Sequence, residues 1–142
     1  LQQMLGDTGF GTQLNYTIVQ SPLHYDNFSY GQQSFLVGLS DSANFVGFYE
    51  KGAWQARVAY NWRGKFLTAT NDSLGIVNPI YTAPYGQWDL SASYKINDKL
   101  SVSLDGINVT NRTQRLYTRN IHELIYLAQT GPRYMFGVQY KF

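Results

Sequence analysis

The sequence predicts an all-β fold, built from long strands that alternate apolar and polar side chains. The clearest is 132–142, an unbroken period-2 pattern that ends on an aromatic residue. One face of this segment carries only apolar or aromatic side chains: Tyr134, Phe136, Val138, Tyr140 and Phe142. Strands of soluble sheets usually need about five or six residues. A longer strand with one apolar and one mostly polar face suits a wall between lipid and water, which predicts a transmembrane β-barrel.

The composition supports this prediction. Charged residues make up 14% of the 142 residues, roughly half the usual share, while aromatic residues reach 16%. No run of about 18 apolar residues exists, so a transmembrane helix is excluded. The absence of cysteine excludes disulfides and thiolate metal sites, and the net charge of +2 gives no reason to expect a nucleic-acid partner.

Six segments show strand patterning and predict a six-stranded antiparallel meander. They are 9–20, 41–50, 53–63, 87–96, 100–110 and 132–142. The parity of the second is ambiguous, because Phe45 and Tyr49 compete with Val46 and Phe48 for the apolar face. The fifth changes parity near Asp105-Gly106, where a β-bulge would absorb one residue.

The connections alternate in length. Residues 50–52 and 97–99 read as tight hairpin turns, in which Gly52 or Asn97 can take a positive φ. Between the other strands lie segments of roughly 20 residues: 21–40, 64–86 and 111–131. Short turns at one end and long loops at the other are typical of outer-membrane barrels.

Charge and aromatic placement point the same way. In the four strands of clear parity, 53–63, 87–96, 100–105 and 132–142, every charge lies opposite the apolar face, as expected if a Lys or Arg in lipid costs about 2–4 kcal/mol. An ordinary half-buried soluble sheet would segregate charge equally well. Aromatic residues near both ends of the apolar stripes favour the membrane barrel over the soluble sheet, because they match the aromatic girdles at the two membrane interfaces. We therefore predict a lipid-facing girdle of Trp54, Tyr60, Trp62, Trp88, Tyr94 and Tyr134.

The long loops are the expected meeting place for a ligand. Their aromatic and basic side chains suit stacking on sugars or aryl groups, although they could equally pack on one another. The candidate ligand-binding residues are Tyr25, Phe28, Tyr30, Tyr81, Tyr85, Arg115, Tyr117 and Arg119. His24 and His122 are isolated, and we expect no catalytic residues, no metal site and no cofactor. The pattern in 121–128 allows a short amphipathic helix, but continuation of the neighbouring strands is favoured.

Several segments together resemble the C-terminal barrel of TonB-dependent receptors. The first is Leu39-Ser40-x-x-Ala43-Asn44-x-x-x-x-Tyr49-Glu50-Lys51-Gly52, followed by Ala56-Arg57-Val58-Ala59-Tyr60-Asn61-Trp62-Arg63. Others are Tyr85-Gly86-Gln87-Trp88-Asp89-Leu90 and Gly106-Ile107-Asn108-Val109-Thr110-Asn111. The ending Gln129-Thr130-Gly131-x-Arg133-Tyr134-x-x-Gly137-Val138-x-Tyr140-Lys141-Phe142 is also similar, although Pro132 departs from the commonly basic residue there.

This resemblance implies a 22-stranded barrel in the outer membrane of a Gram-negative bacterium, closed by an N-terminal plug. Residues 1–142 would be its last six strands, without the plug and the remaining strands. The family imports scarce ligands such as siderophores, cobalamin or carbohydrates, energised by the TonB complex through the plug. Gly137, Tyr140 and Phe142 look like the signal read by the barrel assembly machinery, although Met135 stands where a polar residue is usual. Outer-membrane lipid and a small-molecule or oligosaccharide ligand complete the expected partners.

Two alternatives remain at the level of sequence. A soluble lipocalin-like domain for a small ligand would need about eight strands that close around an apolar interior. An outer-membrane enzyme on a small barrel would need a catalytic constellation, which the sequence does not offer.

Overall fold

The structure is a computed structural model that describes residues 2–31, 33–71 and 74–142. These residues form two antiparallel β-sheets and one short 3-10 turn, η1 (Gly6–Thr8). In chain order the strands are β1 (Gln2–Met4), β2 (Phe10–Thr17), β3 (Ser42–Lys51), β4 (Trp54–Arg63), β5 (Phe66–Asn71), β6 (Val77–Thr82), β7 (Tyr85–Lys95), β8 (Leu100–Ile107), β9 (Gln114–Tyr117), β10 (Leu124–Ala128) and β11 (Arg133–Tyr140).

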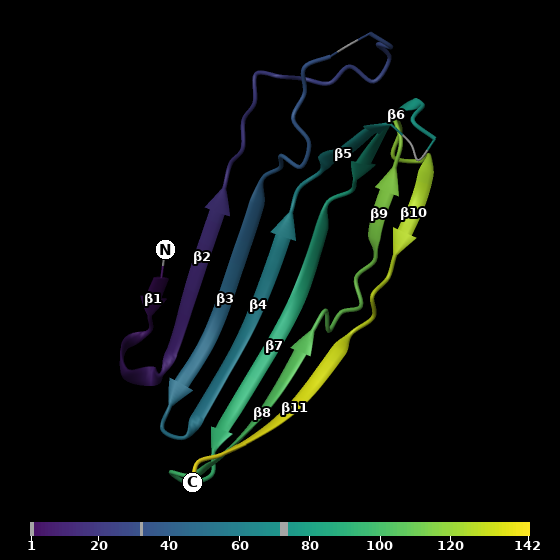
Figure 1. The fold of residues 1–142 in the computed structure, drawn as a ribbon. Helices are drawn as coiled ribbons and strands as arrows, with labels where there is room; N and C mark the ends of the chain where they lie inside the picture. Colours follow the sequence, from purple (N-terminus) through teal and green to yellow (C-terminus); the bar gives the residue numbers. More distant parts are fainter. Residues whose placement is uncertain (1, 32, 72–73) are drawn as a thin grey trace.

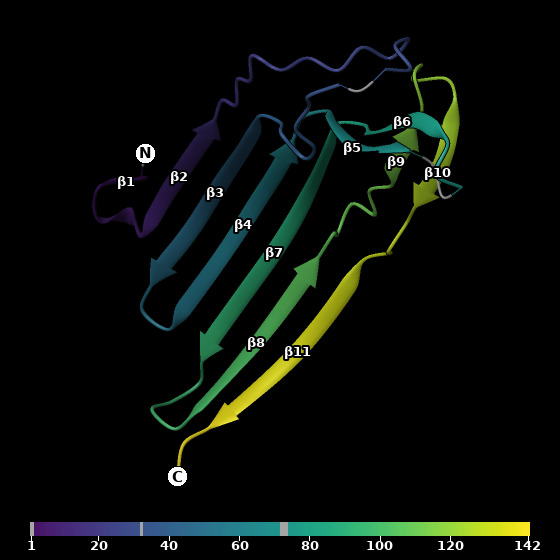
Figure 2. The same cartoon turned by 45° about the horizontal axis from the view of Figure 1, so that its top comes forward.

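The larger sheet, here called the main sheet, has the strand order β1-β2-β3-β4-β7-β8-β11. The chain leaves it twice, between β4 and β7 and between β8 and β11, and builds a second sheet of order β10-β9-β6-β5 (Figure 1). We call the end of the main sheet with the tight turns the turn end, and the opposite end the loop end. The second sheet lies beyond the loop end, and the C-terminus lies at the turn end (Figures 1 and 2).

The prediction of an all-β, antiparallel fold is confirmed, and each of the six predicted strands corresponds to a long strand of the main sheet. The six-stranded meander is wrong in two respects. A seventh, three-residue strand, β1, pairs with β2, and two segments expected to be loops carry the second sheet. Both sheets are open in the described part of the chain, so closure into a 22-stranded barrel stays a prediction.

The second sheet escaped the sequence patterning because its strands are irregular. The register between β5 and β6 shifts twice, and Pro79 stands inside β6. Between β9 and β10 the register shifts once more, so the period-2 pattern breaks within a few residues. The favoured strand reading of 121–128 is confirmed by β10, and no α-helix forms there.

The β-bulge predicted at Asp105-Gly106 is absent. Pairing of β8 with β11 runs without a shift from Leu100 to Ile107. The change of parity marks the end of the strand instead, because Asn108 has a φ of 54° and turns the chain. The side chain of Val109 then lies against Gly106, whose missing side chain leaves room for it.

The two tight turns use different devices. Gly52 adopts a φ of 62°, which a residue with a side chain rarely takes. Asn97 has no positive φ; its side-chain oxygen accepts hydrogen bonds from the amides of Lys99 and Leu100, both at 2.9 Å. An Asx turn therefore closes the second hairpin.

The register settles the ambiguous parity of β3. Phe45 pairs with Tyr60 and Tyr49 pairs with Ala56, so the odd-numbered residues of β3 share a face with the aromatic residues of β4. Val46 and Phe48 lie on the other face, where the ring of Phe48 covers Gly11 of β2.

Candidate functional site

One face of the main sheet, here called the apolar face, is assembled from all six long strands. Paired residues of antiparallel strands project on the same side, so the register defines its members. Its large side chains are Phe10, Leu14, Tyr16, Phe45, Tyr49, Trp54, Val58, Tyr60, Trp62, Trp88, Leu90, Tyr94, Leu100, Val102, Leu104, Tyr134, Phe136, Val138 and Tyr140. The only charge in the register of this face is Lys51, which stands at the tight turn.

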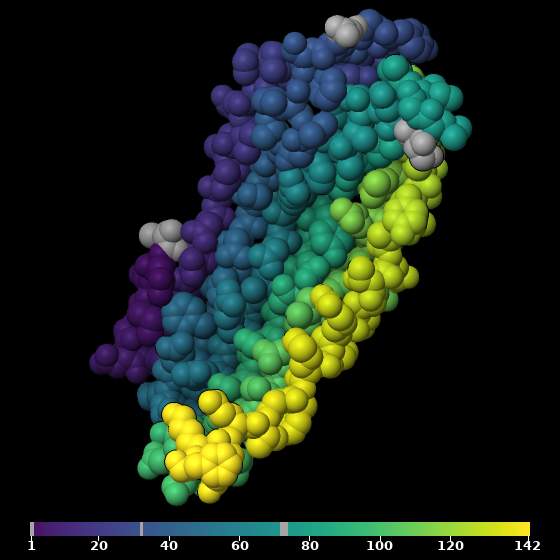
Figure 3. All heavy atoms as spheres, in the orientation of Figure 1, coloured from purple at the N-terminus to yellow at the C-terminus, as the bar shows by residue number. Residues whose placement is uncertain are grey.

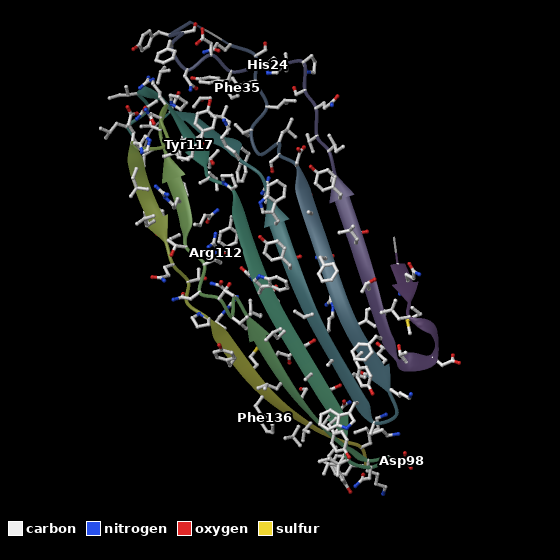
Figure 4. All side chains as sticks on the ribbon, turned by 180° about the vertical axis from the view of Figure 1, so that it is seen from behind. His24, Phe35, Asp98, Arg112, Tyr117 and Phe136 are labelled. Carbon is white, nitrogen blue, oxygen red and sulfur yellow. The ribbon has the colours of Figure 1, made fainter. Side chains whose placement is uncertain are left out.

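Among residues 2–31, 33–71 and 74–142, no second layer covers these side chains. The strands lie as adjacent bands across the view of Figure 3, and Figure 4 shows no element across the reverse side of the main sheet. Leu90, near the middle of the apolar face, is 47% exposed and Phe136 is 72% exposed. A soluble protein rarely leaves so large a contiguous apolar surface open to water. The lipocalin-like alternative needed an apolar interior, whereas here the apolar side of an open sheet faces outward.

Aromatic side chains gather in two bands on the apolar face. At the turn end, Trp54 contacts Tyr94 with ring centres 4.5 Å apart, and Phe10 contacts Tyr49 at 4.7 Å. Toward the loop end, Tyr60 contacts Trp88 at 4.7 Å.

Trp62 also lies in the loop-end half of the apolar face, whereas Tyr134 shares the middle row of Val58, Leu90 and Gly106. Eight residues separate Trp54 from Trp62, which is about 26 Å along the strand before tilt. The six predicted girdle residues therefore share one face, with Tyr134 between the turn-end and loop-end groups, and their contact with lipid stays a prediction.

The reverse side, here called the polar face, carries the charges of the long strands. Arg57 pairs with Ser91, which in turn pairs with Asp105, so these three lie in one row across β4, β7 and β8. Asp89 accepts three hydrogen bonds: from Asn61 at 3.2 Å, from Gln87 at 2.7 Å and from the amide of Asn108 at 2.9 Å. The polar face is thus able to meet water or polar protein.

A compact cluster occupies the second sheet beyond the loop end (Figure 4). The rings of Tyr81 and Tyr117 stack with centres 5.7 Å apart, and the ammonium group of Lys65 lies over the ring of Tyr81. Tyr81 donates a 2.5 Å hydrogen bond to the side-chain oxygen of Asn27. Tyr81 therefore contacts Tyr117 and Lys65 through its ring and Asn27 through its hydroxyl, and Tyr117 is only 5% exposed.

Burial has an electrostatic consequence for both tyrosines. Desolvation raises the pKa of Tyr81, with smaller contributions from Tyr25 and Tyr117, against the Asn27 hydrogen bond. Desolvation also raises the pKa of Tyr117. Burial therefore favours the neutral form of both phenols.

Arg119 braces the segment 21–40 against the second sheet. Its guanidinium donates to the carbonyl oxygen of Asn27 at 3.0 Å, to the side-chain oxygen of Asn78 at 3.2 Å and to the carbonyl oxygen of Val77 at 3.2 Å. These contacts join segments 41 to 92 residues apart in the chain. Arg119 consequently has a positioning role, and three of its five N–H donors are engaged in it.

The eight predicted loop residues are only partly brought together. Phe28, Tyr81, Tyr117 and Arg119 line one open pocket of about 640 Å³, and Tyr25 packs edge-on against Phe35.

Three of the eight lie elsewhere. Tyr30 is 79% exposed, and Arg115 is exposed on β9. Tyr85 lies on the polar face of β7, where its hydroxyl donates to Gln87 at 2.9 Å. Contact of any of the eight residues with a ligand stays a prediction.

Sequence reasoning missed the polar partners of this cluster. Lys65, Asn120 and Glu123 also line the pocket, while Asn27 and Asn78 tie its walls together. Only the tertiary structure reveals these roles, because single loop asparagines carry no pattern in the sequence.

The C-terminal residues proposed as an assembly signal lie along the β11 edge. Gly137 faces Ser103, whose hydroxyl occupies the space a side chain would need. The rings of Tyr140 and Phe142 meet edge-on at 5.4 Å. Phe142 is exposed at the turn end, where another protein can reach it.

Within the described residues no group of three or more His, Cys, Asp and Glu side chains forms a potential metal site. His24 lies at the loop end, far along the chain from His122. No helix in the described part of the chain is long and apolar enough to cross a membrane.

Comparison with known proteins gives one extensive match and one partial one. Two curated proteins of Ureaplasma parvum serovar 3, both named UvrABC system protein C, are 32% identical to the chain over 96 residues. The match covers 63% of this chain, but the chain spans only 16% of their length. So small a share of a longer protein does not transfer that name. No solved structure matches the chain.

The sequence model of the family described as "TonB dependent receptor-like, beta-barrel" matches residues 5–111, well over half of the chain. That family consists of outer-membrane transport receptors, and it is not an enzyme family. The match spans β2, β3, β4, β7 and β8, which build most of the apolar face. The chain therefore belongs to the TonB-dependent receptor-like β-barrel family.

Proposed function

We propose that the chain forms part of the wall of an outer-membrane transport receptor in a Gram-negative bacterium. The apolar face meets lipid, and Trp54, Tyr60, Trp62, Trp88, Tyr94 and Tyr134 form the two interfacial girdles. The single observation that carries this proposal is the uncovered apolar face, with its charges segregated to the opposite side. Lipid is the surrounding that makes such a face stable.

Residues 1–142 are the C-terminal part of a 22-stranded barrel whose plug and other strands lie outside this chain. The open edges at β1 and β11 support this view, since unpaired backbone groups at membrane depth cost several kcal/mol each. The neighbouring strands of the complete barrel would pair with both edges. The main sheet contributes seven strands where six were expected, and the additional strand, β1, is only three residues long.

The transport cycle follows from the family. A scarce ligand, such as a siderophore, cobalamin or a carbohydrate, binds at the loop end and passes inward with energy delivered by the TonB complex through the plug. The chain itself performs no catalysis in this scheme. The aromatic and polar pocket around Phe28, Lys65 and Glu123 supports a contact site at the loop end. Gly137, Tyr140 and Phe142 are recognised by the barrel assembly machinery during insertion.

The experiment uses the complete reading frame that contains this chain. We expect the product in the outer-membrane fraction, as a heat-modifiable band on electrophoresis. Growth on the transported nutrient should require both this receptor and TonB. Recovery in the soluble periplasm, or uptake that survives deletion of TonB, would contradict the proposed function.

A further inference from the structure

The polar face carries an unusual row of four carboxamides near the loop end. Asn15 pairs with Asn44, Asn44 with Asn61, and Asn61 with Gln87, so the four side chains stand side by side across β2, β3, β4 and β7. We call this set the carboxamide row. Neighbouring strands are about 4.8 Å apart, so the row presents an amide at each strand over about 14 Å.

The next row toward the loop end continues this chemistry with hydroxyl groups. Thr17 pairs with Ser42, and Arg63 pairs with Tyr85. Side chains of both rows line an open recess of about 490 Å³, within the size range of small-ligand sites.

The recess is nearly uncharged. Arg63 is its one charged residue, and its guanidinium donates to Ser40 at 3.0 Å and to the carbonyl oxygen of Gly38 while it covers the ring of Phe66. The carboxylate of Asp89, one row toward the turn end, accepts hydrogen bonds from three neutral amide donors. An anionic ligand would therefore find no uncommitted cation in this recess.

The carboxamides retain capacity to bind a ligand. Each carries two donors and two acceptor lone pairs. Asn44 donates to Asn61 at 2.5 Å, which leaves Asn44 a second donor and its oxygen. Asn15 is exposed, and in the described part of the chain its side chain makes no hydrogen bond. The row is thus linked enough to be rigid and open enough to accept hydroxyl groups.

We propose that the carboxamide row binds a neutral oligosaccharide along the inner wall of the receptor. Closely spaced groups that both donate and accept hydrogen bonds match a chain of sugar hydroxyls, and the strand spacing is close to the length of one pyranose unit. Tyr85 supplies a ring at the margin of the recess, a typical partner for a sugar ring. This inference rests on the proposed function, because it takes the polar face to be the lumen of the receptor.

The position of the row favours a ligand over the plug as its occupant. Asn61 is seven residues from Trp54 at the turn end, or about 23 Å along the strand. It therefore stands near the mouth through which a ligand enters. The rows nearer the turn end differ in chemistry, because they hold Arg57, Asp105 and Glu50.

The test uses the complete receptor, purified in lipid nanodiscs, and isothermal titration calorimetry. The probes are neutral oligosaccharides of four to six units derived from starch, cellulose, xylan and chitin, with a ferric siderophore and cobalamin as competing classes. The test variant is Asn44→Ala with Asn61→Ala. The matched control is Gln55→Ala with Ser93→Ala. These two residues form a cross-strand pair on the polar face between β4 and β7, joined by a 3.3 Å hydrogen bond.

We expect at least one neutral oligosaccharide to bind the receptor. The test variant should bind that oligosaccharide about tenfold more weakly, equivalent to about 1.4 kcal/mol. The control variant should change the affinity less than twofold. Binding of none of the four glycans, or unchanged affinity in the test variant, overturns the inference. Loss of thermal stability with unchanged affinity also overturns it and assigns the row to the plug. TonB-dependent uptake of the siderophore or cobalamin without glycan binding leaves the proposed function standing while this inference falls.

Discussion

Leu90 offers the sharpest test of which face of the sheet meets lipid. It pairs with Val58 on one side and Gly106 on the other, near the middle of the apolar face. Val58 itself stands four residues, about 13 Å, from both Trp54 and Trp62 along β4, so this row lies in the middle of the apolar stripe of that strand. Leu90→Arg therefore places a cation at the centre of the proposed lipid contact, where the neighbouring side chains offer no carboxylate.

The expected cost is about 2–4 kcal/mol, the range for Arg or Lys at the bilayer midplane. This lowers the folded-to-unfolded ratio roughly 30- to 700-fold. The control is Ser91→Arg, one residue along β7, which projects from the polar face between Arg57 and Asp105. Its cost should stay below about 1 kcal/mol, because the new cation meets water and a carboxylate.

The assay is urea-induced unfolding of the complete receptor in lipid vesicles, followed by tryptophan fluorescence, with the heat-modifiable fraction as a second readout. Equal costs for the two variants would refute the assignment of the faces. A larger cost for Ser91→Arg would reverse it.

Three further predictions concern single contacts of the complete receptor. Asn108 is 2% exposed, its side chain accepts a hydrogen bond from the amide of Arg112 at 2.9 Å, and its φ is 54°. Asn108→Ala should therefore lower the free energy of unfolding by about 2–4 kcal/mol, and Asn108→Gly should cost less because glycine adopts a positive φ without strain. Equal costs for the two variants would contradict this. Gly86→Ala should lower the melting temperature because the hydroxyl of Tyr60 fills the space of the new methyl group, and Tyr60→Phe should rescue part of the loss; no rescue would place the strain elsewhere. Because burial raises the pKa of Tyr81 above its ordinary 10.0, the neutral phenol and its bond to Asn27 persist below pH 10 and are lost as the pH rises through the raised pKa. Proteolysis around Asn27 should therefore rise only at strongly alkaline pH, and in Tyr81→Phe, where the Arg119 bond to Asn27 remains, it should be faster than in the unmutated protein and lose this rise. A rise near neutral pH would exclude this mechanism.

The long strands were predictable because lipid and water impose a strict two-residue period on them. Gln87 to Ile96 alternates without exception, and β7 matches it within two residues. Segment 41–50 was harder, since Phe45 and Phe48 lie on opposite faces and only pairing with β4 shows which one is apolar. The structure places Phe48 over Gly11, a neighbour that is distant in the sequence.

The composition of the aromatic cluster in the second sheet was predictable from the sequence, but its geometry was not. The aromatic loop residues correctly indicated a cluster beyond the loop end. The sequence could not show that the rings of Tyr81 and Tyr117 stack on one another. Arg119 was expected to contact a ligand, which stays a prediction; nothing in the sequence indicated that its guanidinium also donates to Asn27, Val77 and Asn78. These contacts depend on the irregular second sheet, for which local patterning gives no signal.

The carboxamide row shows the same limit. Asn15, Asn44, Asn61 and Gln87 stand at unremarkable polar positions of four separate strands. Their alignment depends on the register of three strand pairs, which the sequence does not specify on its own.

The central claim is that lipid covers the apolar face and water or polar protein covers the other. It is tested most directly by nitroxide labels on single cysteines at positions 87–95 of β7, in the complete receptor with its other cysteines removed, reconstituted in lipid vesicles. This chain itself has no cysteine to interfere. Power saturation should show oxygen access, the signature of lipid, at Trp88, Leu90, Ala92 and Tyr94, and low oxygen access at the odd positions between them. The absence of a two-residue period, or a period of opposite phase, would contradict the account.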